Sequence, residues 1–222
     1  MNTLSTPALS ALLARLFAEE DASRARMEKR LAATPAAERA AFSTGMADYK
    51  SFYSRVKDIH LAVSRQTARL LYMLARTGNA RRVVEFGTSF GISTLHLAAA
   101  VHDNGGGKVI TTEFEPSKVE AARRNFAEAG LVGLIELRSG DALESLAQDL
   151  PDAIDLVLLD GAKSLYPQVL ALVQPRLREG AVIVADNADW SPDYLAQVRD
   201  VKNGYLSVPF GEDVELTVRT AL

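Results

Sequence analysis

The chain contains no cysteine. A disulfide framework, a thiolate metal site and a cysteine nucleophile are therefore excluded. The chain also lacks any stretch approaching the roughly 18 consecutive apolar residues of a membrane span, so we expect no membrane partner. Residues 1–4 are not a basic segment leading into an apolar one, so we expect no signal peptide and a cytoplasmic location.

Excess positive charge is also missing. Lysine and arginine number 25 against 28 aspartates and glutamates, for a net charge of -3. Such a chain has no general attraction to a phosphate backbone, so nucleic acid is not a favoured partner. The 222 residues, 48% of them hydrophobic, suffice for one large domain, or one domain with an appendage, around a proper core.

Glycine is scarce in the first third of the chain, where Gly45 stands alone between Leu4 and Ala75. Alanine, arginine, glutamate, leucine and methionine dominate there, which predicts helices. Residues 34–38 have the pattern of a helix start, with an N-cap threonine, a proline and a capping glutamate. We expect residues 1–63 to form a helical segment that covers a functional site or makes dimer contacts; extra packing on the sheet edge is an equal alternative.

Short apolar strands alternate with helices after Ala80. This pattern predicts an α/β domain over residues 64–222 with a doubly wound, mostly parallel, seven-stranded Rossmann-like sheet. Only residues 209–213 separate the last two strands, so they form a hairpin and the last strand runs antiparallel. The predicted strands are 82–86, 108–113, 134–138, 154–160, 181–186, 204–208 and 214–219, and the predicted helices are 92–101, 116–129, 142–148, 166–177 and 193–201.

Ligands of open α/β sheets bind beyond the carboxyl ends of the strands. The first strand ends near Glu85, and the turn after it contains Gly87 and Gly91, which allow close backbone approach. The spacing is not GxGxxG, and the acidic Glu85 suits a ligand with an ammonium or sulfonium charge better than a phosphate. An ordinary glycine turn is the alternative.

Carboxylates also follow the second and third strands. Glu113 ends the second strand, where it can accept hydrogen bonds from both hydroxyls of a ribose. Asp141 follows the third strand, where an adenine would lie, and it is equally consistent with a helix N-cap. The two roles of Asp141 are compatible.

Three oxygen-bearing side chains follow the next two strands. Asp160 ends the fourth strand, and Asp186 and Asn187 end the fifth. Adjacent strand ends bring them together, and such a set suits Mg²⁺, with Mn²⁺ and Ca²⁺ as alternatives. Lys163 comes one short turn after Asp160 and reaches the same space. Solvated loop residues at strand ends are the competing interpretation.

Residues 64–222 resemble the class I S-adenosylmethionine-dependent, cation-dependent O-methyltransferases, which include catechol and caffeoyl-coenzyme A O-methyltransferases. The resemblance is carried by residues 84–93, 112–116, 159–166 and 185–187. It implies three groups of site residues: Glu85, Gly87, Ser93, Glu113 and Asp141 for S-adenosylmethionine; Asp160, Asp186 and Asn187 for a divalent cation, Mg²⁺ above all; and Asp160 and Lys163 for catalysis, with Glu215 facing the substrate hydroxyl.

The resemblance implies methyl transfer to a hydroxyl of a small acceptor, a catechol or another vicinal diol. We also expect a homodimer. Lys163 would be the general base if the adjacent cation and partial burial depress its pKa. Two departures stand out. Plant-type members have Asp-Ala-Asp-Lys where this chain has Asp160-Gly161-Ala162-Lys163, and the N-terminal helices match no substrate-binding pattern.

Two other functions remain open. A methyltransferase that acts on RNA would use the same cleft with a basic rim, which this acidic chain does not show. A nucleotide-binding Rossmann-like protein without chemistry would not need Asp160, Lys163, Asp186 and Asn187 together.

Overall fold

The computed structural model describes residues 2–33, 49–211 and 213–220. In this part of the chain, no helix is both long enough and apolar enough to cross a membrane. The helix start expected at residues 34–38 lies outside the described residues.

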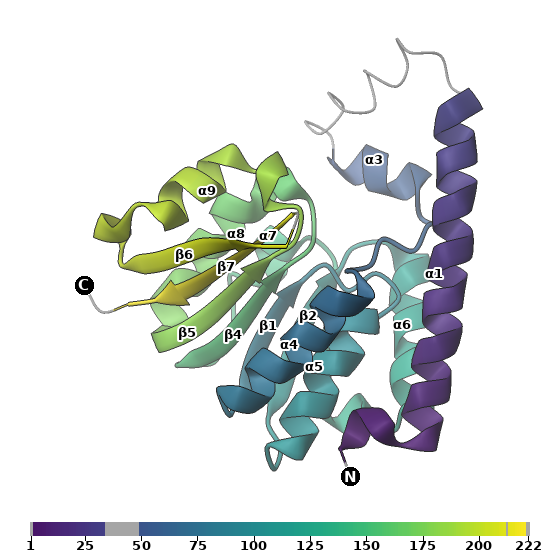
Figure 1. The fold of residues 1–222 in the computed structure, drawn as a ribbon, viewed down its shortest axis with the longest axis horizontal. Helices are drawn as coiled ribbons and strands as arrows, with labels where there is room; N and C mark the ends of the chain where they lie inside the picture. Colours follow the sequence, from purple (N-terminus) through teal and green to yellow (C-terminus); the bar gives the residue numbers. More distant parts are fainter. Residues whose placement is uncertain (1, 34–48, 212, 221–222) are drawn as a thin grey trace.

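Helices cover both faces of one seven-stranded sheet (Figure 1). The strand order is β3-β2-β1-β4-β5-β7-β6, and β7 runs antiparallel to both of its neighbours. The predicted mostly parallel sheet with an antiparallel last strand is therefore confirmed. The strands are β1 Arg82–Phe86, β2 Lys108–Glu113, β3 Ile135–Ser139, β4 Ile154–Leu159, β5 Leu177–Ala185, β6 Tyr205–Phe210 and β7 Val214–Arg219.

The helices fall into two layers. One layer, α1, α4, α5 and α6, shares an apolar core with alternate strand residues such as Val83, Leu156 and Val184, and the other, α7, α8 and α9, packs on the opposite face around Val84, Val157 and Ile183. The α-helices are α1 Pro7–Ala33, α3 Tyr49–Arg55, α4 Arg65–Thr77, α5 Ile92–Asp103, α6 Pro116–Glu128, α7 Ala142–Ser145, α8 Tyr166–Val173 and α9 Pro192–Arg199. Short 3-10 turns lie at Thr3–Ser5, Val132–Leu134, Lys163–Leu165, Gln174–Arg176, Ala188–Trp190 and Val201–Asn203.

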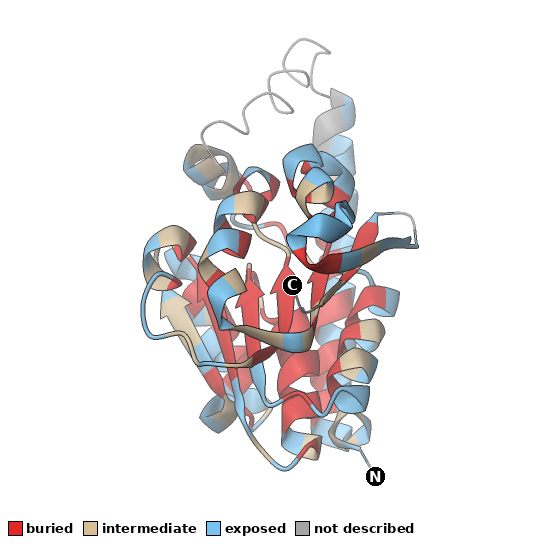
Figure 2. Cartoon of the chain, turned by 90° about the vertical axis from the view of Figure 1, so that its left-hand side faces the viewer, coloured by how far each residue is buried: buried red, intermediate tan, exposed pale blue. Residues whose placement is uncertain are grey.

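The central strands are buried throughout, as a parallel sheet covered on both faces requires (Figure 2). All six residues of β4 are buried, and β1 is buried from Val83 to Phe86. The edge strand β6 is mostly exposed beyond Tyr205.

The N-terminal helix α1 runs alongside α5 and α6 (Figure 1). Its buried leucines, among them Leu12 and Leu16, belong to the same apolar core as the sheet residues. The described part of α1 therefore packs on the sheet layer, whereas the short α3 lies above the strand ends (Figure 1). The division at residue 63 stays a prediction from composition.

Two predicted boundaries were wrong, one for a local reason and one because of a strand partner distant in sequence. The helix expected over residues 166–177 ends at Val173, because Pro175 lacks the backbone N–H that would continue it. The strand that follows begins at Leu177 instead of residue 181, because Leu177 pairs with Ile154 of β4.

The helix expected over residues 142–148 is a single turn that ends at Ser145. The Arg138 guanidinium donates hydrogen bonds to the carbonyl oxygens of Ser145, Gln148 and Asp149, and these bonds hold the chain out of a helix. The predicted bounds of β1, β2 and β7 are confirmed.

Candidate active site

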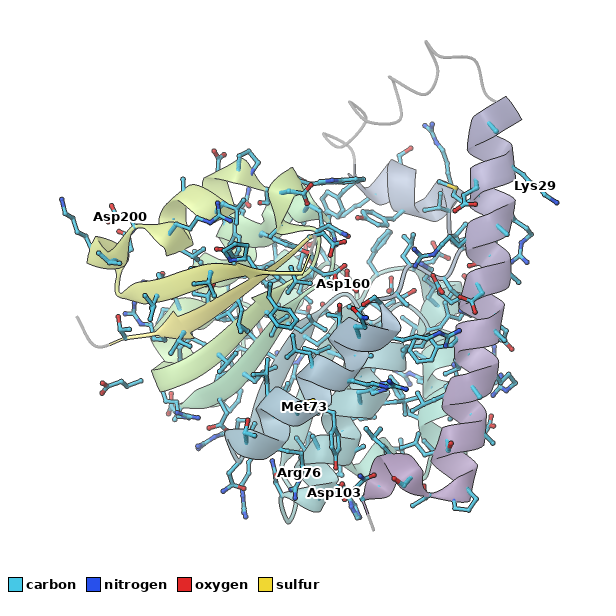
Figure 3. All side chains as sticks on the ribbon, in the orientation of Figure 1. Lys29, Met73, Arg76, Asp103, Asp160 and Asp200 are labelled. Atoms are coloured by element: carbon cyan, nitrogen blue, oxygen red, sulfur yellow. The ribbon has the colours of Figure 1, made fainter. Side chains whose placement is uncertain are left out.

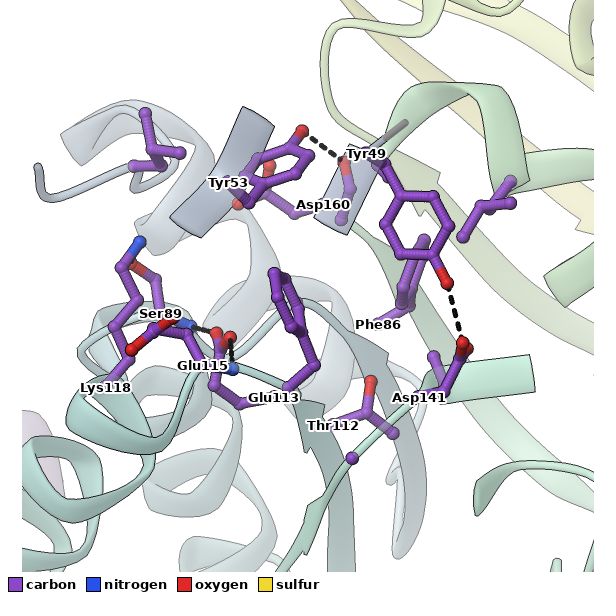
Figure 4. A pocket seen from close by; sticks show the side chains of 18 residues that line it. Tyr49, Tyr53, Phe86, Ser89, Thr112, Glu113, Glu115, Lys118, Asp141 and Asp160 are labelled. Carbon is purple, nitrogen blue, oxygen red and sulfur yellow. Dashed lines mark hydrogen bonds between the residues drawn. The ribbon is translucent and has the colours of Figure 1, made fainter. Parts of the chain in front are cut away.

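A cleft of about 620 Å³, partly open to solvent, lies at the carboxyl ends of β1, β2, β3 and β4. Figure 4 shows Asp141 at one side of the cleft, Lys118 at the other and Glu113 between them. The lining residues are Tyr49, Tyr53, Leu61, Phe86, Gly87, Ser89, Thr112, Glu113, Phe114, Glu115, Lys118, Gly140, Asp141, Ala142, Asp160, Gly161, Ala162 and Leu165.

The floor of the cleft depends on a close approach between the ends of β1 and β4. The backbone N–H of Asp160 donates to the carbonyl oxygen of Phe86 at 2.8 Å. A Cβ on Gly87, whose φ is +104°, would lie 2.5 Å from the Asp160 carbonyl oxygen. A Cβ on Gly161 would lie 2.4 Å from the Phe86 ring. Residue 87 therefore requires glycine, whereas a side chain at residue 161 would require the Phe86 ring to move.

Glu113 lies in the wall of the cleft and is 9% exposed. Its carboxylate accepts hydrogen bonds from the backbone N–H groups of Ser89 at 2.9 Å and Glu115 at 3.0 Å. Burial raises the pKa of Glu113, although these bonds and the nearby Lys118 oppose the shift. The two bonds fix the carboxylate beside the cavity, in the position predicted for it.

Asp141 is both an N-cap and a lining residue. Its carboxylate accepts from the backbone N–H of Leu143 at 3.0 Å, and also from Tyr49 Oη and Lys50 Nζ, each at 2.7 Å. Burial raises the pKa of Asp141, but the hydrogen bonds from Lys50 and Tyr49 outweigh it and the pKa is lowered. The predicted N-cap is thus confirmed, and the contact of Asp141 with an adenine stays a prediction.

Two tyrosines of α3 were not predicted as site residues. Tyr49 reaches Asp141, and Tyr53 Oη lies 3.4 Å from the carbonyl oxygen of Gly161. Both line the cleft. Their spacing of four residues, which places two aromatic rings on one helix face, was the available signal.

Glu85 and Ser93 lie beneath the cleft and do not line it. The buried Glu85 carboxyl accepts hydrogen bonds from Ser93 Oγ at 2.5 Å, from Thr111 Oγ1 at 2.6 Å and from Thr94 Oγ1. Burial raises the pKa of Glu85 to about 7, against the effect of these hydroxyls. In the described arrangement, Glu85 and Ser93 therefore stabilise the end of β1 beneath the cleft.

Asp160, Lys163 and Asp186 come together at the ends of β4 and β5. Figure 3 labels Asp160 near the centre of the view, and this residue also lines the cleft. Lys163 Nζ lies 3.0 Å from Asp160 Oδ1, and both side chains are 9% exposed. Burial raises the pKa of Asp160, and burial together with the Asp160 charge raises that of Asp186 to about 8.

Lys163 is held as an ammonium in this arrangement. Burial opposes its charge, but Tyr166, Asp160 and other neighbours outweigh that effect, and its pKa is raised well above the usual value. A general base needs a depressed pKa. The Asp160–Lys163 pair alone does not lower the pKa of Lys163 in this way.

Asn187 follows Asp186 in a left-handed conformation, with φ of 49°, which asparagine tolerates. Its side-chain amide donates to Asp213 Oδ2 at 2.8 Å. Within the described residues, no three acidic, histidine or cysteine side chains form a metal-binding cluster. The predicted ligand set is instead two aspartates and an asparagine.

Tyr166 joins the two strand ends and was missed by the sequence analysis. Its buried hydroxyl lies 2.7 Å from the carbonyl oxygen of Leu159 and 2.8 Å from that of Asp186, so it donates between the ends of β4 and β5. The Lys163 ammonium lies 5.4 Å from the centre of its ring. A tyrosine three residues after Lys163 in the matching segment was the available signal.

Glu215 lies apart from the cleft lining. Its carboxylate accepts two hydrogen bonds from Arg199 on α9, at 2.9 and 2.7 Å, and one from Ser207 at 2.7 Å. The side chain is therefore committed to the contact between β7 and α9. Its predicted role toward a substrate hydroxyl stays a prediction.

A family model described as O-methyltransferase matches residues 38–216. The chain is 36% identical over 140 residues to the catechol O-methyltransferase of Mycobacterium tuberculosis, a match that covers 63% of each chain. It is 32% identical over 130 residues to the catechol O-methyltransferase of Niastella koreensis, over 57% of this chain and 58% of that one. These alignments span less than two thirds of either relative.

Solved structures give longer matches. The cofactor-bound structure of Rv0187 from MTB has a TM-score of 0.70 at 26% identity and covers 97% of this chain and 93% of that one. The O-methyltransferase TomG from Streptomyces achromogenes, in complex with S-adenosylmethionine, has a TM-score of 0.65 at 28% identity, over 81% of this chain and 90% of that one.

The buried Glu85 predicts a specific pH dependence of stability. Because folding raises the pKa of Glu85 from 4.5 to about 7, the contribution of this group is full below pH 4.5 and is lost as the pH rises through 7. Glu85→Gln is neutral at every pH. Between pH 4.5 and 8, the free energy of unfolding of the wild type should fall by about 3 kcal/mol relative to Glu85→Gln.

Urea denaturation across this pH range measures the difference. The exposed Glu179→Gln is the matched control and should follow the wild type. Parallel pH curves for the wild type and Glu85→Gln would show that Glu85 is charged in the folded protein.

Proposed function

The chain belongs to the O-methyltransferase family, and on that premise we propose that it transfers a methyl group from S-adenosylmethionine to a hydroxyl of a small acceptor. One observation carries the proposal. Asp160 lines the cleft and also belongs to the buried group that it forms with Asp186 and Lys163. A ligand in the cleft would have this group at one of its walls.

The cleft residues suit S-adenosylmethionine. Glu113, held by two backbone N–H groups, keeps lone pairs for the two ribose hydroxyls. Asp141 and the backbone at Gly140 would face the adenine, and Gly87 permits close approach of the chain. Carboxylates also stabilise the sulfonium charge. We assign Glu85 and Ser93 to the cofactor through their support of the β1 turn.

The residues present also suit a divalent cation held by Asp160, Asp186 and Asn187. Burial, and after it the neighbouring Asp160 charge, raises the pKa of Asp186 to about 8. A bound cation would stabilise the charged forms of both carboxyls. Within the described residues, the side-chain amide oxygen of Asn187 accepts no hydrogen bond and remains for a ligand. When bound, a divalent cation such as Mg²⁺ supplies Lewis acidity that lowers the pKa of an acceptor hydroxyl.

The acceptor class we propose is a catechol or another vicinal diol, as in the named activity of the curated relatives. Transfer forms the O–CH₃ bond and breaks the S–CH₃ bond, and the hydroxyl proton must pass to a base. Lys163 is buried at Asp160. It would receive that proton only as a neutral amine, after its ammonium has released its own extra proton to solvent. Glu215 would act only after release from Arg199.

The competing functions fit less well. Four of the five charged lining residues are acidic, which disfavours an RNA acceptor with its phosphates. A nucleotide-binding protein without chemistry would leave the buried Asp160, Asp186 and Lys163 group without a purpose. Binding of S-adenosylmethionine without transfer to any hydroxyl would favour that class.

We also propose that the chain forms a homodimer through β6. This edge strand pairs only with β7 among the described strands, and Leu206, Val208 and Phe210 on one of its faces are 60%, 53% and 46% exposed. An unpaired strand edge beside apolar side chains is self-complementary across a two-fold axis, since a second copy offers the same edge.

The metal prediction concerns activity on a catechol. Transfer of the methyl group should vanish in EDTA and return with Mg²⁺, and Asp186→Asn should abolish it. The pKa of Asp186 is about 8, so asparagine replaces a carboxyl that is largely neutral at pH 7 and the fold should survive. Chromatography of the methylated product measures the activity, and calorimetry with S-adenosylhomocysteine checks the fold and cofactor site.

The exposed Asp189→Asn, three residues along the chain, is the matched control and should keep full activity. Full activity of the wild type in chelator would contradict the metal requirement. Binding of S-adenosylhomocysteine without transfer to any vicinal diol would contradict the acceptor class.

The base prediction concerns Lys163. A general base commonly contributes a factor of about 10²–10⁴, so Lys163→Met should lower kcat by that factor with little change in KM. Arginine keeps the charge but does not give up its proton, so Lys163→Arg should restore little activity. Steady-state kinetics decides the matter, because near-normal activity of Lys163→Arg would make the lysine an electrostatic helper only.

The dimer prediction concerns mass in solution. Sedimentation at micromolar concentration should give twice the 24.0 kDa of the chain. Val208→Glu should give the monomer, because it puts charge into the apolar face, whereas Met73→Glu, at an equally exposed residue on α4, should not. A monomeric wild type would end this proposal.

A further inference from the structure

Lys118 lies in the wall of the cleft, on the first turn of α6, and is only 4% exposed. Lysines are almost never buried to this extent without a partner of opposite charge. Within the described residues, no carboxylate oxygen lies within the 4 Å of an ion pair, and the ammonium has one hydrogen-bond partner, Ser89 Oγ at 3.4 Å. It also lies 5.6 Å from the centre of the Phe90 ring.

A structural role for this cation is weakly supported. Glu113 is the nearest candidate to be held by it, but the backbone N–H groups of Ser89 and Glu115 already fix that carboxylate. Burial lowers the pKa of Lys118, against the attraction of Glu113 and Glu115. Burying the Lys118 ammonium at the cleft therefore costs free energy, and an anion bound in the cleft would offset that cost.

The charges that line the cleft indicate which ligand group Lys118 would bind. Among the described lining residues, Glu113, Glu115, Asp141 and Asp160 are acidic, and Lys118 is the one cation. Under the proposed function, the methyl donor brings a sulfonium, an ammonium and a single carboxylate. The acidic walls suit the first two, and Lys118 is the group left for the third.

The layout of the cleft agrees with this pairing (Figure 4). Asp141, proposed for the adenine, and Lys118 lie at opposite sides, with Glu113, proposed for the ribose, between them. An elongated nucleoside with an amino-acid tail would therefore direct the tail toward Lys118. The same corner contains Ser89, three residues before the 12-residue helix α5, whose N-cap Gly91 has no capping side chain. The helix dipole adds positive potential there.

We propose that Lys118 binds the carboxylate of the amino-acid end of the methyl donor. This inference rests on the proposed function, because it takes S-adenosylmethionine as the ligand. The ammonium replaces its long bond to Ser89 by a charged hydrogen bond to the carboxylate.

The test pairs a variant with a ligand that lacks the carboxylate. Calorimetry gives the Kd of S-adenosylmethionine and of decarboxylated S-adenosylmethionine for the wild type, Lys118→Met and Lys118→Arg. Charged hydrogen bonds predict that Lys118→Met weakens S-adenosylmethionine by about 10- to 100-fold. The decarboxylated ligand should change by less than about 3-fold, and Lys118→Arg should recover part of the loss for the intact ligand alone.

Matched controls distinguish donor binding from a structural role and from acceptor binding. Lys108→Met, at an exposed lysine on β2, should leave both Kd values unchanged. Thermal melting of Lys118→Met should show no loss of stability, because the substitution removes a buried cation. Lys118→Met should affect the KM values for two acceptors equally, catechol and its carboxylated analogue protocatechuate.

Three results would overturn the inference. Equal weakening of both donor ligands would mean that Lys118 only shapes the cleft, and no weakening would mean that it binds nothing there. A loss confined to the KM for protocatechuate would assign the lysine to an acceptor carboxylate. A wild type that binds neither donor would instead refute the proposed cofactor, which is a different failure.

Discussion

The contact between the ends of β1 and β4 is the constraint from which the cleft follows. The Asp160 N–H reaches the Phe86 carbonyl, and Gly87 and Gly161 leave the space that this approach needs. Parallel pairing then brings the ends of β2 and β5 to the same edge. Asp186 lies beside Asp160 because β4 and β5 are neighbours, whereas Glu113 lies across β1 on the same sheet edge. The Tyr166 hydroxyl links the ends of β4 and β5.

Much of this arrangement is predictable from the sequence, because it depends on where apolar segments stop. The bounds of β1, β2 and β7 were predicted correctly. The structure brings Asp160, Lys163 and Asp186 together at the strand ends, and their roles, with that of Asn187, stay predictions. Parallel strand ends share one edge whatever their order along the chain, so a polar residue after an apolar strand can be placed without knowing its contacts.

The rest depends on partners distant in sequence. Nothing near Tyr49 indicates that its hydroxyl reaches Asp141, and nothing near Glu215 indicates that Arg199 binds it. Lys118 looks like an ordinary helix lysine until Ser89 and Phe90, in the turn after β1, pack against it. The start of β5 at Leu177 was missed for the same reason, since only its pairing with Ile154 makes Leu177 a strand residue.

Because α3 is anchored on Asp141, a ligand that binds this carboxylate must replace hydrogen bonds that α3 already makes. Tyr49 and Lys50 both donate to Asp141 Oδ2, on a carboxylate that lines the cleft. A ligand that takes this oxygen replaces bonds already made, so its measured affinity reports the difference between the new contacts and the old ones. Tightening α3 would therefore weaken equilibrium binding, even though every residue that touches the ligand stayed the same.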